Sequence, residues 1–144
     1  MSDVEALQTT LAAEHAAVYV FGLLGGRTSA SATPQLFGAV SAAYTAHRGR
    51  RDQLTRTLLD LGETPVAAEA AYEVDGAVTG PDRVAAVALS TEEACAATYS
   101  WLVANTVADE RRWAIGALNE AAVRALVFRG TPEMFPGADE HTDR

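Results

Sequence analysis

The sequence predicts an all-α protein that folds as a bundle of four helices. Alanine, which has the highest helix propensity, is the commonest residue, and runs of the β-branched residues typical of strands are scarce. Apolar residues recur every three or four positions in four long segments, most of which are separated by Gly, Pro or short polar stretches. The chain has 144 residues, about half of them hydrophobic, which is enough for one domain with a packed core.

Signals for helix ends place the four helices along the chain. Ser2 and Glu5 have the spacing of a capping box at the start of the first helix, and Thr33 followed by Pro34 is typical of the start of the second. Gly49 lies inside the second helix at a cost of roughly 1 kcal/mol relative to alanine, and we expect it to let a neighbouring backbone come close. The predicted helices span residues 3–24, 34–61, 81–105 and 108–129 of a single domain, 1–144, which ends in a tail at 130–144.

The segment at residues 63–80 is the longest without clear helical periodicity. A helix of about 25 residues is about 40 Å long at 1.5 Å per residue. Eighteen extended residues reach that far at about 3.3 Å each. The segment can therefore cross the length of the bundle, which makes the third helix parallel to the second. Beyond the fourth helix, we expect the apolar residues Met134, Phe135 and Pro136 to fold back on the bundle.

Three of the helices carry a polar residue near the middle of an apolar face. On the second helix, steps of three and four residues give a face that reads Phe37, Val40, Tyr44, His47, Arg51, Leu54, Leu58 and Leu61. The first helix places Glu14 in the middle of its apolar face. The third places Glu92 there, with Glu93 left open as the alternative. For the fourth helix we expect an inward face made of Ile115, Leu118, Ala122, Ala125 and Leu126.

This arrangement resembles the ferritin-like bundle, in which one long crossover joins two helical pairs. In that family, the first and third helices each give a Glu and the second and fourth each give Glu-x-x-His, and together they hold two iron or manganese ions. Glu14, Glu92 and His47 match this pattern, whereas Tyr44 stands where the second helix should have Glu. The fourth helix offers two motifs that lack the final His: Glu110-x-x-Trp113 and Glu120-x-x-Val123.

Three short segments are more specifically similar to an alanine-rich ferritin-like family of unknown function from actinobacteria. They are residues 13–19 (AEHAAVY), 46–52 (AHRGRRD) and 135–137 (FPG). The resemblance covers nearly the whole chain. It implies the ferritin-like fold, and it carries no activity over to this chain.

We interpret the polar centre as a buried network that replaces a di-metal site, in a bundle that is non-catalytic. A buried carboxylate is costly alone, but arginine and protonated histidine neutralise it and donate hydrogen bonds to it. An arginine beside a cation site also repels a metal ion, and we therefore expect no cofactor. The predicted network comprises Glu14, Tyr44, His47, Arg51 and Glu92.

Two other interpretations stay open, so the sequence does not decide whether the protein is an enzyme. A degenerate oxidoreductase would bind iron or manganese through a reduced ligand set, for which Glu14, His47 and Glu92 are the candidates. A small-molecule pocket would form between alanine-rich faces, with His47 or Arg51 holding an anion or carboxylate. The aromatic residues available to such a pocket are Tyr19, Tyr44, Tyr99 and Trp101.

Net charge and targeting signals restrict the partners. The formal net charge of −8 disfavours nucleic acid. The first residues lack a basic segment followed by an apolar one, and the uncharged stretch at 16–26 is too short to span a bilayer, so we expect a cytoplasmic protein without a membrane partner. Cys95 is the only cysteine, which excludes an internal disulfide. Apolar alanine faces predict a homo-oligomer, most simply a homodimer.

Overall fold

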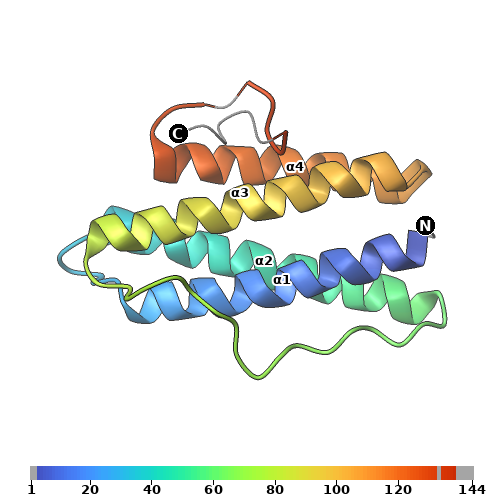
Figure 1. Ribbon diagram of the computed structural model, residues 1–144, viewed down its shortest axis with the longest axis horizontal. Helices are drawn as coiled ribbons and strands as arrows, with labels where there is room; N and C mark the ends of the chain where they lie inside the picture. Colours follow the sequence, from blue (N-terminus) through green and yellow to red (C-terminus); the bar gives the residue numbers. More distant parts are fainter. Residues whose placement is uncertain (1–2, 133, 139–144) are drawn as a thin grey trace.

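Figure 1 shows the computed structural model of the protein, which describes residues 3–132 and 134–138. This part of the chain forms four helices and no strands: α1 (Asp3–Gly26), α2 (Pro34–Asp60), α3 (Pro81–Asn105) and α4 (Ala108–Arg129). The predicted fold class, an all-α four-helix bundle, is confirmed. Each helix begins and ends within two residues of its predicted bounds.

The helices form two antiparallel pairs that lie side by side. α1 runs against α2, and α3 runs against α4 (Figure 1). α1 packs against both α2 and α3, whereas α4 packs chiefly against α3. The segment between α2 and α3 returns along the length of the bundle, so α3 runs parallel to α2 (Figure 1). The predicted long crossover is therefore confirmed.

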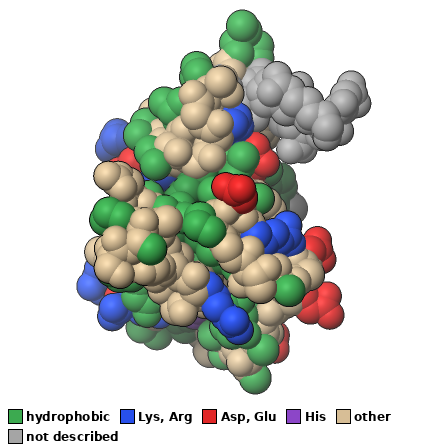
Figure 2. All heavy atoms as spheres, turned by 90° about the vertical axis from the view of Figure 1, so that its left-hand side faces the viewer, with side chains coloured by type: hydrophobic (Ala, Val, Ile, Leu, Met, Phe, Trp, Pro, Cys, Tyr) green, Lys and Arg blue, Asp and Glu red, His purple; other side chains and the backbone are tan. Residues whose placement is uncertain are grey.

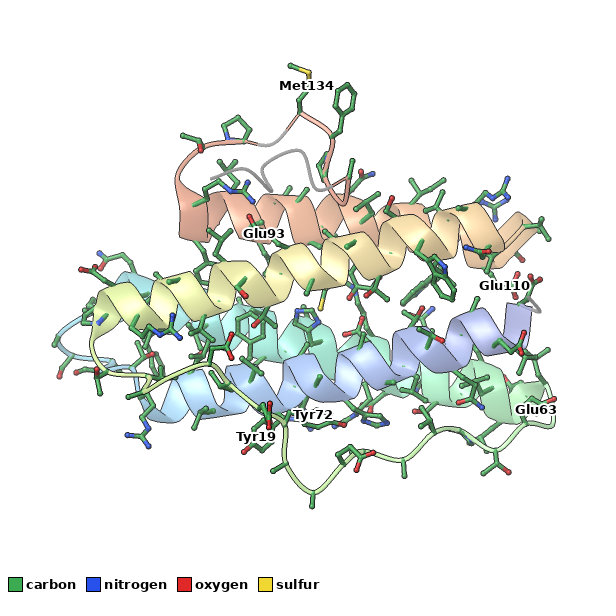
Figure 3. All side chains as sticks on the ribbon, viewed as in Figure 1. Tyr19, Glu63, Tyr72, Glu93, Glu110 and Met134 are labelled. Atoms are coloured by element: carbon green, nitrogen blue, oxygen red, sulfur yellow. The ribbon has the colours of Figure 1, made fainter. Side chains whose placement is uncertain are left out.

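Polar residues on the outer side of α1 hold this crossover in place. The Gln8 side chain donates to the Thr64 carbonyl at 2.8 Å and accepts from the Val66 amide at 2.8 Å. The Nε2 atom of His15 lies 3.0 Å from the Val66 carbonyl. Farther along, the rings of Tyr19 and Tyr72 meet with their centroids 5.5 Å apart (Figure 3). His15 therefore fastens the crossover and faces away from the centre of the bundle.

A polar centre divides the apolar core into two ends. Each fully buried aliphatic or aromatic side chain contributes roughly 1.5–3 kcal/mol to the free energy of unfolding. The core at one end contains Phe21, Leu24, Val40 and Val84. The core at the other end contains Leu7, Leu11, Leu54 and Leu58. The fully buried Glu14, His47 and Glu92 lie between these two ends.

The inward face of α4 differs from the prediction. Its buried residues are Ala114, Ala117, Ala121 and Ala125. Ile115 and Leu126, which were expected to point inward, are 45% and 38% exposed. The close packing of α4 on α3 places small side chains at the contact, so the larger apolar residues lie outside it. Choosing inward positions by hydrophobicity alone was wrong for these two residues.

Two further local predictions need correction, and a third is not tested. The predicted capping box involves Ser2, which lies outside the described residues, so it stays a prediction. Thr33 makes no cap at α2, because its hydroxyl donates to the Ser29 carbonyl at 3.1 Å. A Cβ atom at Gly49 would meet nothing within 4 Å, so no backbone approaches that glycine.

The end of the described chain returns to the bundle at a glycine. Gly137 has a φ of +81°, and a Cβ atom there would lie 2.6 Å from the Ala96 carbonyl oxygen on α3. Met134 and Phe135 are 79% and 62% exposed, and Figure 3 shows Met134 pointing away from the helices. The prediction that this apolar group folds back was wrong for Met134, whereas Pro136 is half-buried and the turn at Gly137 lies against α3.

Two properties bear on possible partners of the protein: the apolar length of its helices and the distribution of basic side chains at one end. None of the described helices is long and apolar enough to cross a lipid bilayer. Figure 2 views the end of the bundle where α1 finishes and α2 starts, and basic side chains stand there at several separate places among hydrophobic ones. That end therefore presents no single continuous basic surface.

Candidate functional site

The centre of the bundle is an imidazole held between two carboxylates. His47 Nδ1 lies 2.7 Å from Glu14 Oε2, and His47 Nε2 lies 3.2 Å from Glu92 Oε1. All three side chains are fully buried. Phe21 stacks on the imidazole with ring centroids 5.3 Å apart and an angle of 14° between the planes. An ionised carboxylate can only accept, so in its protonated form, which the raised pKa favours, His47 donates from both nitrogens.

Four further residues extend this arrangement. The Tyr99 hydroxyl donates to Glu14 Oε1. Arg124 Nε donates to Glu92 Oε1 at 2.7 Å. Arg50 donates to the Tyr99 oxygen at 3.3 Å, to the Ala117 carbonyl at 3.4 Å and to the Glu120 carboxylate. We call the seven side chains the central network: Glu14, His47, Arg50, Glu92, Tyr99, Glu120 and Arg124.

The central network balances its charges. Its carboxylates are Glu14, Glu92 and Glu120, and its cations are protonated His47, Arg50 and Arg124. An uncompensated charge inside a protein costs several kcal/mol, whereas paired and hydrogen-bonded charges are tolerated. The balance therefore explains how the buried members of the network are tolerated inside a small bundle, with the largely exposed Glu120 at its edge.

The pKa values of His47 and Glu92 shift in the directions that favour their charged forms. Burial lowers the pKa of His47, but the hydrogen bonds and negative charges of Glu14 and Glu92 outweigh it and leave that pKa raised. Burial raises the pKa of Glu92, but contacts with His47 and Arg124 outweigh it and leave that pKa lowered. Both shifts stabilise the ion pair.

Two neighbouring groups stay neutral. Burial and the negative charge of Glu14 raise the pKa of the Tyr99 phenol well above its usual range, so it remains a hydrogen-bond donor. Burial and the charges of Glu14 and Glu92 likewise raise the pKa of the Cys95 thiol well above its usual range. A buried thiol of this kind is a poor nucleophile.

The structure brings Glu14, His47 and Glu92 together but places Tyr44 and Arg51 elsewhere. Arg51 forms an ion pair with Asp52 at 2.7 Å and is partly exposed. The Tyr44 ring lies beneath the Arg48 guanidinium, 5.5 Å from the ring centroid. Both had been predicted to join the network, and neither does. The inward face of α2 continues from His47 by a step of three residues instead of four, which selects Arg50 instead of Arg51.

The remaining network residues were missed for different reasons. Tyr99 is buried on α3, and it had been considered as one of the aromatic residues available to a pocket, not as a member of the network. Arg124 follows Ala121 by three residues and so continues the alanine face of α4, which was the available signal. Glu93 points towards α4 and pairs with Arg129 at 2.6 Å (Figure 3), so the inward carboxylate of α3 is Glu92.

The donor atoms of the centre contact one another. Both imidazole nitrogens are engaged by carboxylates, and Arg124 occupies one oxygen of Glu92. Glu92 Oε2 is buried without a hydrogen-bond partner, but a single free oxygen does not make a site. Among the described residues, no group of three His, Cys, Asp or Glu side chains is arranged to hold a metal. His141 lies outside the described part of the chain.

Residues 6–140 match the family described as a domain of unknown function (DUF4439). This chain belongs to that family. The crystal structure of a conserved hypothetical protein from Mycobacterium tuberculosis is similar to this chain, with a TM-score of 0.81 and 31% sequence identity over 89% of this chain and 88% of that one. No curated protein is similar enough to count as a relative. The comparisons therefore establish the family and carry no activity.

Proposed function

We propose that this DUF4439 protein is a non-catalytic, ferritin-like bundle in which an ion-paired network stands in place of a di-metal site. The observation that carries the proposal is the position of His47 between Glu14 and Glu92. A histidine binds a metal through an unprotonated ring nitrogen. Each ring nitrogen lies within hydrogen-bond distance of a carboxylate, and in protonated His47 neither nitrogen has a free lone pair.

The order of the helices supports the ferritin-like part of the proposal. Two antiparallel pairs joined by one long crossover are the topology of that bundle. Glu14, His47 and Glu92 come from α1, α2 and α3, as a metal site of that kind requires. From α4 the centre receives the guanidinium of Arg124. That cation and the imidazolium supply the positive charge that metal ions give to a ferritin-like centre.

Metal analysis tests the proposal. Purified protein would be loaded anaerobically with Fe(II) or Mn(II), desalted and analysed for metal, beside His47→Gln and an exposed control, Glu63→Gln (Figure 3). We expect no stoichiometric metal in any of the three proteins. Stoichiometric metal in the parent and in Glu63→Gln, lost in His47→Gln, would instead support an iron or manganese oxidoreductase.

We also propose a homodimer and a cytoplasmic location. Ile115, Val123 and Val127 are 45%, 62% and 62% exposed and lie at helical spacing on the outer side of α4. Such a face is suited to isologous contact with a second copy. Cys95 is a free thiol, which suits a reducing compartment. Light scattering of the parent and of Val123→Asp measures the first point, and a monomeric parent would contradict it.

A further inference from the structure

A groove of about 430 Å³ lies between α2 and α4. These two helices make little contact with one another, so the space between them is not filled by interlocking side chains. Its volume lies within the range of roughly 300–1,000 Å³ that is usual for small-molecule sites. The residues that line this α2–α4 groove are Ala46, Gly49, Arg50, Gln53, Arg112, Trp113, Gly116, Ala117 and Glu120.

Two glycines keep the α2–α4 groove open. Gly49 and Gly116 stand on opposite walls, and a Cβ atom built on either would meet nothing within 4 Å. Glycine inside a helix costs roughly 0.5–1 kcal/mol relative to alanine. Neither glycine is required by a close neighbour or a positive φ angle. What the two have in common is that a larger side chain at either position would occupy the groove.

Arg50 brings a buried positive charge to this groove. It is only 7% exposed, and its guanidinium lies 5.1 Å from the centroid of the Tyr99 ring. Its two bonds to neutral oxygens, to Tyr99 and Ala117, are long at 3.3 and 3.4 Å. The remaining partner is the carboxylate of Glu120, whose side chain is 68% exposed. The anion that neutralises Arg50 therefore stands at the solvent edge of the groove.

We propose that the α2–α4 groove binds a small organic monocarboxylate, whose carboxylate takes the place of Glu120 on Arg50. The exchange swaps one negative charge for another, so the charge balance of the central network is kept. The apolar part of the ligand lies against Trp113, Ala46 and Ala117.

A dianion fits this groove less well. Arg112, the other basic residue of the groove, is already paired with Asp109 at 2.7 Å and is 80% exposed. The chain also carries a net charge of −8, which repels highly charged anions. This site lies beside the Glu14–His47–Glu92 centre, and it would exist whether or not that centre binds metal.

Titration with benzoate, and with benzamide as its uncharged counterpart, tests the site. The fluorescence of Trp113 reports binding in a Trp101→Phe background, and calorimetry provides a second measurement. We expect saturable binding of benzoate in the millimolar range and at least about tenfold weaker binding of benzamide, because benzamide lacks the negative charge that makes the hydrogen bond from Arg50 charge-assisted. Glu120→Gln removes the competing carboxylate and should tighten benzoate binding about two- to fivefold.

Two glycine substitutions distinguish a blocked groove from an unfolded protein as the cause of lost benzoate binding. Gly116→Leu places a larger side chain in the α2–α4 groove and leaves Arg50 in the sequence, and it should abolish benzoate binding while the helix content is kept. Gly38→Leu is the matched control, because Gly38 is an exposed α2 glycine with the same free space that lies outside the groove. Equal binding of benzoate and benzamide, or unchanged benzoate binding in Gly116→Leu, would overturn the proposal.

Discussion

Removal of the central imidazole is the sharpest test of the network. His47→Ala leaves the buried carboxylates of Glu14 and Glu92 without the group that lies between them, and it leaves a cavity against Phe21. Removing one partner of a buried ion pair costs about 3–5 kcal/mol. A loss of 1 kcal/mol lowers the melting temperature of a chain of this size by about 2–4 °C, so the melting temperature should fall by roughly 6–20 °C.

Urea unfolding followed by circular dichroism measures this loss as a change in the free energy of unfolding. The control is His15→Ala, which removes a histidine whose contact is a single bond to the Val66 carbonyl and should cost about 1 kcal/mol. In a double-mutant cycle, Glu14→Gln and His47→Ala should deviate from additivity by about 1–3 kcal/mol, because they share one bond. If His47→Ala unfolds within about 1 kcal/mol of the parent, the ion-paired description of the centre is wrong.

Two more predictions concern pH and the final turn. The raised pKa of His47 stabilises the fold fully below its ordinary value of 6.5, and this contribution is lost as pH rises through the folded-state pKa. The lowered pKa of Glu92 stabilises the fold above its ordinary value of 4.5, and this contribution is lost as pH falls through the folded-state pKa. Urea unfolding across pH should therefore show highest stability between these values, and His47→Ala should lack the alkaline decline. Gly137→Ala should lower the free energy of unfolding by about 1–3 kcal/mol, because Gly137 has a φ of +81° and lies against Ala96. The control Gly38→Ala, at an exposed position within a helix, should not lower it. Equal effects of the two substitutions would refute the stated role of Gly137.

The fold could be predicted from the sequence because its signals are local. Helical periodicity and the breaks at Gly62 and Pro81 are properties of short windows, and they locate helix ends well. The length of the crossover then determined the topology. The inward face of α4 was mispredicted because burial there depends on how closely α3 approaches. The sequence of α4 alone carries no information about the distance between the two helices.

The site could be predicted only in part for a related reason. Glu14, His47 and Glu92 each stand in the middle of an apolar face, which is visible in the sequence. Arg50 and Arg51 both lie about one turn from His47, so the choice between them depends on the partners that surround α2. Glu120 was visible in the sequence only as part of the incomplete motif Glu120-x-x-Val123, because its contact with the network depends on the position of Arg50 on another helix.

The crossover has a consequence for the way in which the protein assembles. It divides the chain into two helical hairpins, α1–α2 and α3–α4, that meet face to face (Figure 1). The first hairpin contributes one carboxylate, Glu14, and two cations, His47 and Arg50, to the central network. The second hairpin contributes two carboxylates, Glu92 and Glu120, and one cation, Arg124. The bonds from His47 to Glu92 and from Tyr99 to Glu14 form only when the hairpins dock at one height. Small alanine side chains restrict the position of one hairpin along the other only weakly. These hydrogen bonds therefore determine the register of the two hairpins.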